Sequence, residues 1–395
     1  MTTATEAING RTGDFNRPAM LLAAAGAAGI CIYLAAFHGW RQAALFAVGF
    51  GAGIALYHAA FGFTAAWREV ASSGRSAGLR AQMIMMAATV LVFTPLIAQG
   101  EIGGMALRGN VSPLNLAVIC GAFMFGLGMQ LGGGCASGAL FTAGGGNARM
   151  LITLAAFIVG SVIGTWHWSL WQDVPGFEPV SLSGSFGVGG GILFSMLLFG
   201  AVWLIAARYE RSRHGAIERE WRPTSSRAWL TGPWPLLAGA VALALVNIAT
   251  LLLAGRPWGV TSAFALWGAK LATPLGIDVT QWAYWQRPNL QAALKANVFN
   301  DVTSVMNFGI TLGALIAASL AHKFAPSFRI PTRSVLAAVI GGLMLGYGAR
   351  IAFGCNIGAY FSGISSTSMH GWLWFAAAFA GSILGTRMRP LFGLR

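Results

Sequence analysis

The sequence predicts an all-α polytopic membrane protein with about nine or ten transmembrane helices, built as two inverted five-span repeats around four short broken or re-entrant helices that converge on the centre. The class follows first from charge. Only 9% of the 395 residues are charged, whereas a soluble domain carries about 25%. It also follows from apolar stretches long enough to cross a bilayer, which takes about 20 residues. An internal repeat predicts the arrangement in two halves.

Ten apolar stretches are expected to cross the membrane. They lie at 20–37, 42–60, 80–98, 114–131, 149–167, 187–207, 234–254, 299–321, 335–353 and 371–387. The regions 109–148 and 351–386 are too long for one helix and contain glycine clusters. Each is therefore expected to hold one span and one segment that re-enters the membrane.

The charge pattern predicts the orientation. A net charge of +14 would suggest nucleic-acid binding in a soluble protein. Here most basic residues stand in short loops, so the positive-inside rule explains them and no nucleic-acid partner is expected. The Arg-rich loop 208–233 is predicted to be cytoplasmic, and the loop 169–186, which lacks Lys and Arg, to be outside. The tails 1–19 and 389–395 are then cytoplasmic at a bacterial-type inner (plasma) membrane, and the two repeats cover 20–168 and 187–388.

The repeat is centred on two Gly-Cys loops. Residues 117–143 align on 337–363 with ten identities in 27 positions, and these include Gly134 with Gly354 and Cys135 with Cys355. Five spans in each half is an odd number, so the second half is expected to enter the membrane upside down. Inverted repeats are common in transporters and place the site near the midplane. A fainter echo relates 60–69 to 256–270, which makes four broken elements in all.

The Gly-Cys loops suit a soft anion. Glycine before each cysteine favours a break in the helix, and a short helix is expected to start just after each cysteine, with an N-terminus that attracts an anion. A thiol is a weak, polarizable donor, and weak contacts at several sites permit conduction. The expected path is lined by both cysteines with their preceding glycines, and by Ser137, Asn356, Gly62 and Thr261.

Three basic residues are candidates for attracting the anion. Lys270 and Arg287 lie in the segment 255–298, which is predicted to be outside, and would form a basic vestibule that raises the local anion concentration. The alternative for Lys270 is contact with lipid headgroups. Arg350 lies in the second Cys block, and an intramembrane charge is a functional candidate. Its alternative is snorkelling or pairing with a helix C-terminus.

The duplicated GxGxxxxxGCxxGAxF block, together with PWGVTSAFALWGAK at 257–270 and AFGFTAAWRE at 60–69, resembles the YeeE/YedE family of sulfur-transport membrane proteins. This resemblance implies import of thiosulfate, or of a related sulfur or selenium compound, past central cysteines that relay the ion without covalent chemistry. Cys135 and Cys355 would be two of them. Where the family often has a third, this sequence has Gly62. His58, one turn earlier, would replace that thiol or bond a neighbouring helix.

Other functions are weighed against this importer. A membrane thiol–disulfide redox protein would join Cys135 to Cys355, which needs Cα atoms about 4.4–6.8 Å apart. A purely structural subunit is disfavoured because broken helices sacrifice backbone hydrogen bonds. The sequence shows no zinc-ligand spacing, so no metal is expected, and no P-loop, which disfavours ATP-driven transport by this chain alone. We expect a transporter or channel-like importer rather than an enzyme, with no cofactor. Expected partners are the small sulfur anion and the lipid bilayer, with a cytoplasmic sulfurtransferase as a further candidate.

Overall fold

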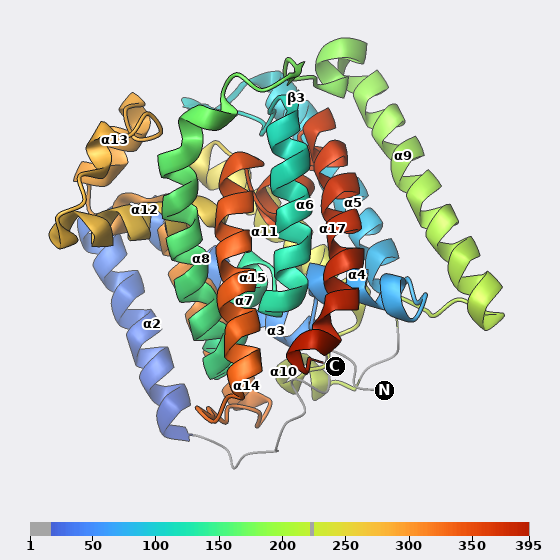
Figure 1. Ribbon diagram of the computed structural model, residues 1–395, viewed down its shortest axis with the longest axis horizontal. Helices are drawn as coiled ribbons and strands as arrows, with labels where there is room; N and C mark the ends of the chain where they lie inside the picture. Colours follow the sequence, from blue (N-terminus) through green and yellow to red (C-terminus); the bar gives the residue numbers. More distant parts are fainter. Residues whose placement is uncertain (1–16, 222–224, 395) are drawn as a thin grey trace.

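The computed structural model describes residues 17–221 and 225–394, which form a bundle of long helices (Figure 1). In this part of the chain, nine segments are long and apolar enough to cross a membrane, which confirms the predicted class. Ten long helices match the ten expected stretches: α2 Arg17–Phe37, α3 Trp40–Ala59, α5 Ala77–Gln99, α6 Leu116–Gly132, α8 Ala148–Trp166, α9 Leu182–His214, α11 Leu236–Ala254, α14 Val302–Leu320, α15 Thr332–Ile351 and α17 Met369–Met388.

Four short helical elements begin where the sequence predicts breaks. They are α4 Phe63–Ser72, α7 Ala136–Gly144, α12 Thr261–Ala272, and the π-helix η5 Asn356–Ser362, which continues into α16 Gly363–Ser365. Each follows a long helix after a turn of a few residues. The helix starts expected after both cysteines are confirmed, although the second is a π-helix rather than an α-helix.

The remaining elements are small. A segment over 273–301 contains η2 Thr273–Leu275, η3 Val279–Gln281, α13 Pro288–Lys295 and η4 Val298–Asn300. The other elements are η1 His167–Trp171, α10 Ala228–Thr231, η6 Arg389–Phe392, and the short antiparallel strand pairs β1 Glu101–Ile102 with β2 Met105–Ala106 and β3 Leu114–Asn115 with β4 Gly176–Phe177. We call the end of the bundle that carries the loop 169–186 the upper end, as in Figure 1, and the end with the last turn of α17 the lower end.

Glycines allow the central helices to approach closely. The most extensive helix contacts are α15 with α8, α14 with α3, α17 with α6, and α15 with α6. A Cβ atom on Gly126 would lie 1.9 Å from the Ala378 carbonyl oxygen, and one on Gly346 would lie 2.2 Å from that of Phe157. Only glycine fits at such crossings, which is how membrane helices commonly pack.

The helix contacts follow the order of the repeat. In chain order, α2, α3, α5, α6 and α8 of the first half correspond to α9, α11, α14, α15 and α17 of the second. The pair α8–α15 then corresponds to α17–α6, α3–α14 to α11–α5, and α2–α14 to α9–α5, and each of these pairs is in contact. Each contact between the halves thus recurs with the roles of the two halves exchanged, which supports the repeat. How the two halves lie relative to the membrane stays a prediction.

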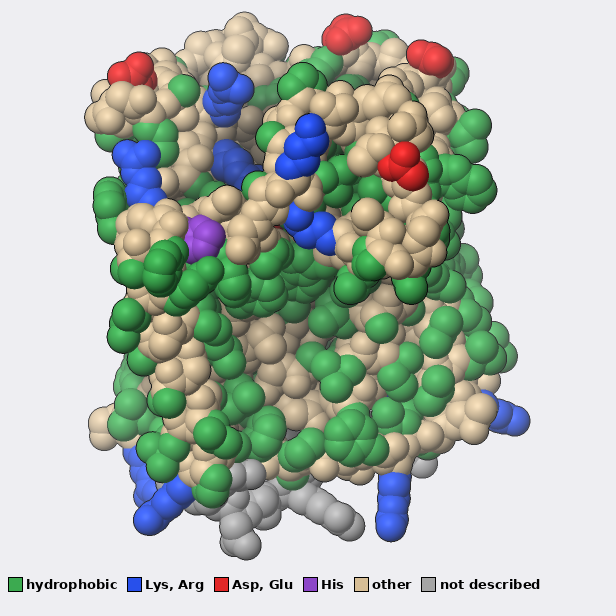
Figure 2. All heavy atoms as spheres, turned by 90° about the vertical axis from the view of Figure 1, so that its left-hand side faces the viewer, with side chains coloured by type: hydrophobic (Ala, Val, Ile, Leu, Met, Phe, Trp, Pro, Cys, Tyr) green, Lys and Arg blue, Asp and Glu red, His purple; other side chains and the backbone are tan. Residues whose placement is uncertain are grey.

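Charge and apolar surface separate along the bundle. Figure 2 shows the face that carries α2, α12 and α13, with Lys and Arg side chains near its upper part and lower edge and a largely hydrophobic belt between them. The outlying helices α2 and α9 expose large apolar side chains, among them Leu22 and Leu197. A belt of this kind suits a lipid environment, since the hydrocarbon core accepts apolar groups.

The Arg-rich loop expected at 208–233 begins later than predicted. Helix α9 continues to His214, so Arg208 and Arg211 are helical. Arginine is a good helix former, and positive charge in a last turn interacts favourably with the helix dipole. Helix α9 also begins earlier than the expected 187, and a non-helical Gly187 (φ 71°) kinks it. Residues 1–16 of the predicted tail 1–19, residues 222–224 of the loop and Arg395 of the tail 389–395 lie outside the described residues.

Candidate functional site

The π-helix η5 contacts α4, α7 and the turn that precedes α12. The Tyr360 ring of η5 lies 6.0 Å from the Phe63 ring at the start of α4. The Ser362 hydroxyl donates to the Trp258 carbonyl oxygen, in the turn before α12, at 2.7 Å. Helix α7 also packs against η5. η5 therefore lies beside α4, α7 and the turn that leads into α12.

The starts of the short helices have no side-chain cap. The N-cap residues Gly62, Cys135, Val260 and Cys355 make no capping hydrogen bond through their side chains, whereas Asn115 caps α6 by accepting from the Val118 amide. The first amide groups of a helix need partners from outside it. Thr261 is buried in the first turn of α12. The starts of α4, α7 and α12 therefore offer amide donors to an anion.

Cys135 is held in a tightly defined loop. Its side chain is buried, and its Sγ atom lies 3.5 Å from the Ser137 hydroxyl oxygen. Just before it, the Gly132 carbonyl oxygen accepts hydrogen bonds from Arg149 Nη1 at 2.9 Å and from Thr153 Oγ1 at 3.1 Å. These contacts fix the backbone that leads through Gly134 into the thiol.

Cys355 follows a strained turn. Phe353 has a φ of 59° and Gly354 a φ of 146°, and both values lie where L side chains are rare. A Cβ atom on Gly354 would stand 2.8 Å from the Ala359 amide nitrogen. The Cys355 carbonyl oxygen accepts from that same amide at 2.8 Å, which starts the helix. Glycine is thus required at 354, and it places the fully buried thiol at the helix start.

Both thiols are free, and they lie in the same region of the protein. Cys135 and Cys355 make no disulfide, and they belong to one buried cluster that also contains Phe63 and Val260. The two thiols are near enough to interact electrostatically. Of the residues predicted to line the path, the structure therefore brings the two cysteines near each other.

Asn356 has an amide without partners. The residue is fully buried, and neither its Oδ1 nor its Nδ2 atom forms a hydrogen bond among the described residues. A buried polar group without a partner costs about 1–3 kcal/mol. An amide left in this state beside a buried thiol is a candidate contact for a polar ligand.

Two candidates lie in contacts of another kind. His58 is in the last turn of α3, and its ring packs 5.5 Å from the Trp234 ring, in the turn before α11. Lys270, predicted to help form a basic vestibule, donates from its ammonium to the carbonyl oxygens of Leu294 and Ala296, at 2.6 and 2.7 Å. Because three N–H donors near the end of a helix readily bind its unpaired carbonyls, Lys270 fastens α13 to α12.

Arg350 and Arg287 converge on one tyrosine. The Arg350 Nη1 group donates to the Tyr284 hydroxyl, and its guanidinium carbon lies 5.4 Å from the Tyr284 ring centroid. The Arg287 guanidinium carbon lies 4.5 Å from the same centroid and 5.1 Å from that of Trp168. The two predicted anion-attracting arginines are therefore brought together, and the Trp168 ring lies beside Arg287.

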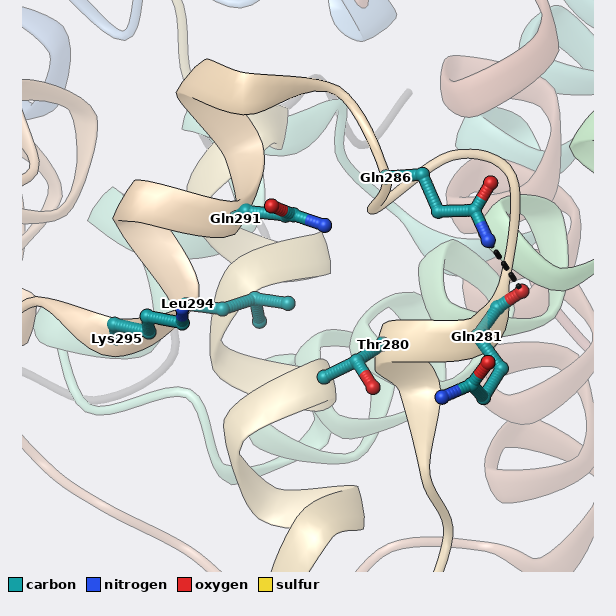
Figure 3. A pocket seen from close by; sticks show the side chains of 6 residues that line it. All are labelled: Thr280, Gln281, Gln286, Gln291, Leu294 and Lys295. Carbon is teal, nitrogen blue, oxygen red and sulfur yellow. Dashed lines mark hydrogen bonds between the residues drawn. The ribbon is translucent and has the colours of Figure 1, made fainter.

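A polar groove opens in the 273–301 segment. It has a cavity volume of about 530 Å³ and is lined by Thr280, Gln281, Gln286, Gln291, Leu294 and Lys295. Figure 3 shows Gln291 and Leu294 extending from α13 toward Thr280 and Gln281 on η3, while Gln286 donates to the Gln281 carbonyl oxygen. Hydrogen bonds from Thr280 hold the pKa of the nearby Asp278 carboxyl below its usual value.

Buried amides that sequence reasoning missed position the short helices. Asn247 on α11 accepts from the Trp258 amide at 2.8 Å, and Asn307 on α14 donates to the Val260 carbonyl oxygen at 3.0 Å. Gln130 on α6 donates to the Thr64 carbonyl oxygen at 3.0 Å. The available signal was an amide inside an otherwise apolar span, since such groups hydrogen-bond across helices.

A bundle of membrane-crossing helices that brings uncapped short helices together around two free thiols has the architecture of a membrane transport protein. The chain belongs to the Sulphur transport family, whose model matches residues 58–384. It is 31% identical to the thiosulfate transporter TsuA of Spirochaeta thermophila over 327 residues, which covers 79% of this chain and 88% of that protein.

Two relatives come from Escherichia coli K12. The chain is 26% identical to the thiosulfate transporter TsuA over 281 residues, covering 65% of this chain and 69% of the relative. It is 30% identical to the probable transporter YedE over 169 residues. The match to YedE spans only 42% of this chain and 41% of that protein.

Proposed function

We propose that this protein imports a sulfur-containing anion such as thiosulfate, or a related sulfur or selenium compound, along a path lined by Cys135 and Cys355. The observation that carries this proposal is the pair of free, buried thiols at matched helix starts in elements that contact each other. The matching thiosulfate transporters support the choice of substrate.

The residues around the thiols suit an ion with two different ends. Thiosulfate carries a soft terminal sulfur and a sulfonate-like end with hard oxygens. The thiols of Cys135 and Cys355 are weak, polarizable donors for the soft end. The Asn356 amide and the first amides of α7 and α12 are donors for the oxygens. Such contacts are weak enough for the ion to leave, and no covalent step is needed.

Gly62 stands where the family often has a third cysteine. A Cβ atom there would meet nothing closer than 3.8 Å, so the start of α4 has room beside it. The path proposed here therefore uses two thiols, with the α4 backbone in place of a third. We assign His58, which packs on Trp234, a supporting position next to this start.

The direction of transport rests on the positive-inside rule. We assign the upper end, with the loop 169–186, to the outside of a bacterial inner membrane and the lower end, with the last turn of α17, to the cytoplasm. An imported ion would then pass from the Cys355 region to Cys135 and leave at the lower end. A cytoplasmic sulfurtransferase is the candidate partner that would consume it.

Uptake of radiolabelled thiosulfate by proteoliposomes tests the proposal. Cys135→Ala and Cys355→Ala should each abolish most uptake while the protein stays folded, as judged by gel filtration. Cys120→Ala is the matched control, because Cys120 is a partly buried thiol on α6, the helix that leads into the Cys135 loop. Uptake at the control level in both site variants would overturn the thiol path.

A further inference from the structure

Arg287 and Arg350 place two positive charges against the ring of Tyr284. The guanidinium carbons lie 4.5 and 5.4 Å from its centroid. The Arg287 Nε group also donates to the Tyr284 carbonyl oxygen at 3.2 Å. One tyrosine thus fixes both arginines through its backbone, its ring and its hydroxyl.

Neither guanidinium has a carboxylate partner within the described parts of the chain. Ion pairs there include those of Arg75, Arg80 and Arg256 with acidic residues, but neither Arg287 nor Arg350 makes one. Arg350 is only 7% exposed, and its Nε group has no hydrogen-bond acceptor among the described residues. Two like charges repel, and a buried charge without a counter-ion is unfavourable. The pair is therefore a favourable place for an anion.

The pair joins the surface to the turn before Cys355. Arg287 is exposed, Tyr284 is buried, and Arg350 lies on α15 five residues before Cys355. The Trp168 ring centroid lies 5.1 Å from the Arg287 guanidinium carbon and 5.7 Å from the Phe353 ring centroid. Phe353 is two residues from Cys355. An anion held by these arginines would stand at the approach to the second thiol.

We propose that Arg287 and Arg350, spaced by Tyr284, form an oxyanion-binding site that captures the oxygen-bearing end of the substrate before its sulfur reaches Cys355. This site deepens the proposed function and rests on it. Guanidinium groups present N–H donors in a planar fork that matches two oxygens of one sulfonate or sulfate group. The site therefore takes thiosulfate, sulfite or sulfate, and it binds poorly a monatomic sulfur anion without oxygens. The thiols further along then discriminate among the oxyanions.

Calorimetric titration of the purified full-length protein with thiosulfate and with sulfate tests this site. Arg287→Gln removes one charge at the surface and should weaken binding of both ions by about tenfold or more, as loss of a charge-assisted hydrogen bond does. The matched control is Lys295→Gln, which removes the same charge from the same 273–301 segment, at a residue that lines the separate groove of Figure 3. The control should bind both ions with a Kd within about twofold of that of the original protein.

Arg350→Lys is the second variant, because it keeps the buried charge and loses the fork. It should also weaken binding, and gel filtration shows whether it is folded; Arg287→Gln, at an exposed position, decides the question if it is not. Equal affinity in Arg287→Gln and Lys295→Gln would overturn the site.

The same titration on the Cys135→Ala/Cys355→Ala protein separates this proposal from the thiol path. This double variant should still bind both ions, because the arginines bind their oxygen atoms, although it should no longer take up thiosulfate. If that double variant transports normally, the thiol path fails, while the Arg287→Gln comparison still decides the oxyanion site. If it binds neither ion, the arginines are not an independent site.

Discussion

Arg149 donates from Nη1 to the Gly132 carbonyl oxygen at 2.9 Å, three residues before Cys135. Its Nε group donates to the Ser334 carbonyl oxygen on α15 at 3.2 Å, and its Nη2 group to that of Leu131. One side chain thus binds the end of α6 and the start of α15, the two helices that precede the Gly-Cys loops. The Cys135 thiol owes its position to an arginine from a third helix, α8.

The first prediction concerns this arginine. Arg149→Ala should lower thiosulfate uptake and reduce the free energy of unfolding by about 1–3 kcal/mol, because the Leu131 carbonyl oxygen loses its charged donor while that of Gly132 keeps only Thr153. Arg333→Ala is the control, because Arg333 is exposed and adjoins Ser334. Uptake and thermal unfolding of both variants measure the effect. Indistinguishable behaviour of the two would show that Arg149 does not position the loop.

The second prediction concerns the unpartnered amide of Asn356. Asn356→Leu removes a buried polar group without breaking any hydrogen bond among the described residues. We therefore expect a higher melting temperature together with reduced thiosulfate uptake. A gain in stability with a loss of activity is the result expected where a functional site keeps an unfavourable polar group.

Asn247→Leu is the control for this variant, because Asn247 accepts from Trp258 at 2.8 Å and donates to Ser362 at 3.2 Å. It should lower the melting temperature, since it leaves the Trp258 amide without its acceptor. If Asn356→Leu lowers the melting temperature and leaves uptake unchanged, the amide has a structural role.

Much of the fold was predictable because the bilayer imposes it. A lipid-exposed segment must be apolar and helical over its whole length, so the ten long helices lie within a few residues of their expected bounds, apart from the extended α9. Glycine before each cysteine predicted the helix starts at Ala136 and Asn356, because glycine favours a break in the preceding helix. The short elements were visible because they depart from the membrane pattern locally.

The contacts that complete the site were not predictable in this way. Tyr284 is hydrogen-bonded to Arg350 across 66 positions of sequence, and Lys270 is hydrogen-bonded to the end of α13. Such partners depend on how separate helices pack, and the local sequence around either residue does not indicate that packing. Arg149 is a clearer case, because a basic residue at the start of a span has the same local pattern as a positive-inside anchor.

The third prediction tests the close helix crossing between α6 and α17. Gly126→Ala adds a Cβ atom 1.9 Å from the Ala378 carbonyl oxygen, so the helices must move apart. The cost should be about 1–3 kcal/mol, as for other overpacked interiors, with a lower melting temperature. Gly51→Ala on α3 is the control, because a Cβ atom there meets nothing within 4 Å. Equal melting temperatures for the two would mean that the crossing is looser than described.

The fourth prediction separates the importer from a thiol–disulfide redox protein. The helices α7 and η5 each start at a free thiol. The relay proposed here needs each of these two sulfur atoms as a neutral donor that is not part of a disulfide. Titration of the denatured protein with a thiol reagent should therefore find all four cysteines reactive, with or without prior treatment by a reductant. Cys31→Ala/Cys120→Ala removes the two thiols outside the site and should leave two reactive groups under both conditions. A loss of both groups that only reductant restores would show a Cys135–Cys355 disulfide and favour redox chemistry, because a weak non-covalent relay has no use for that bond.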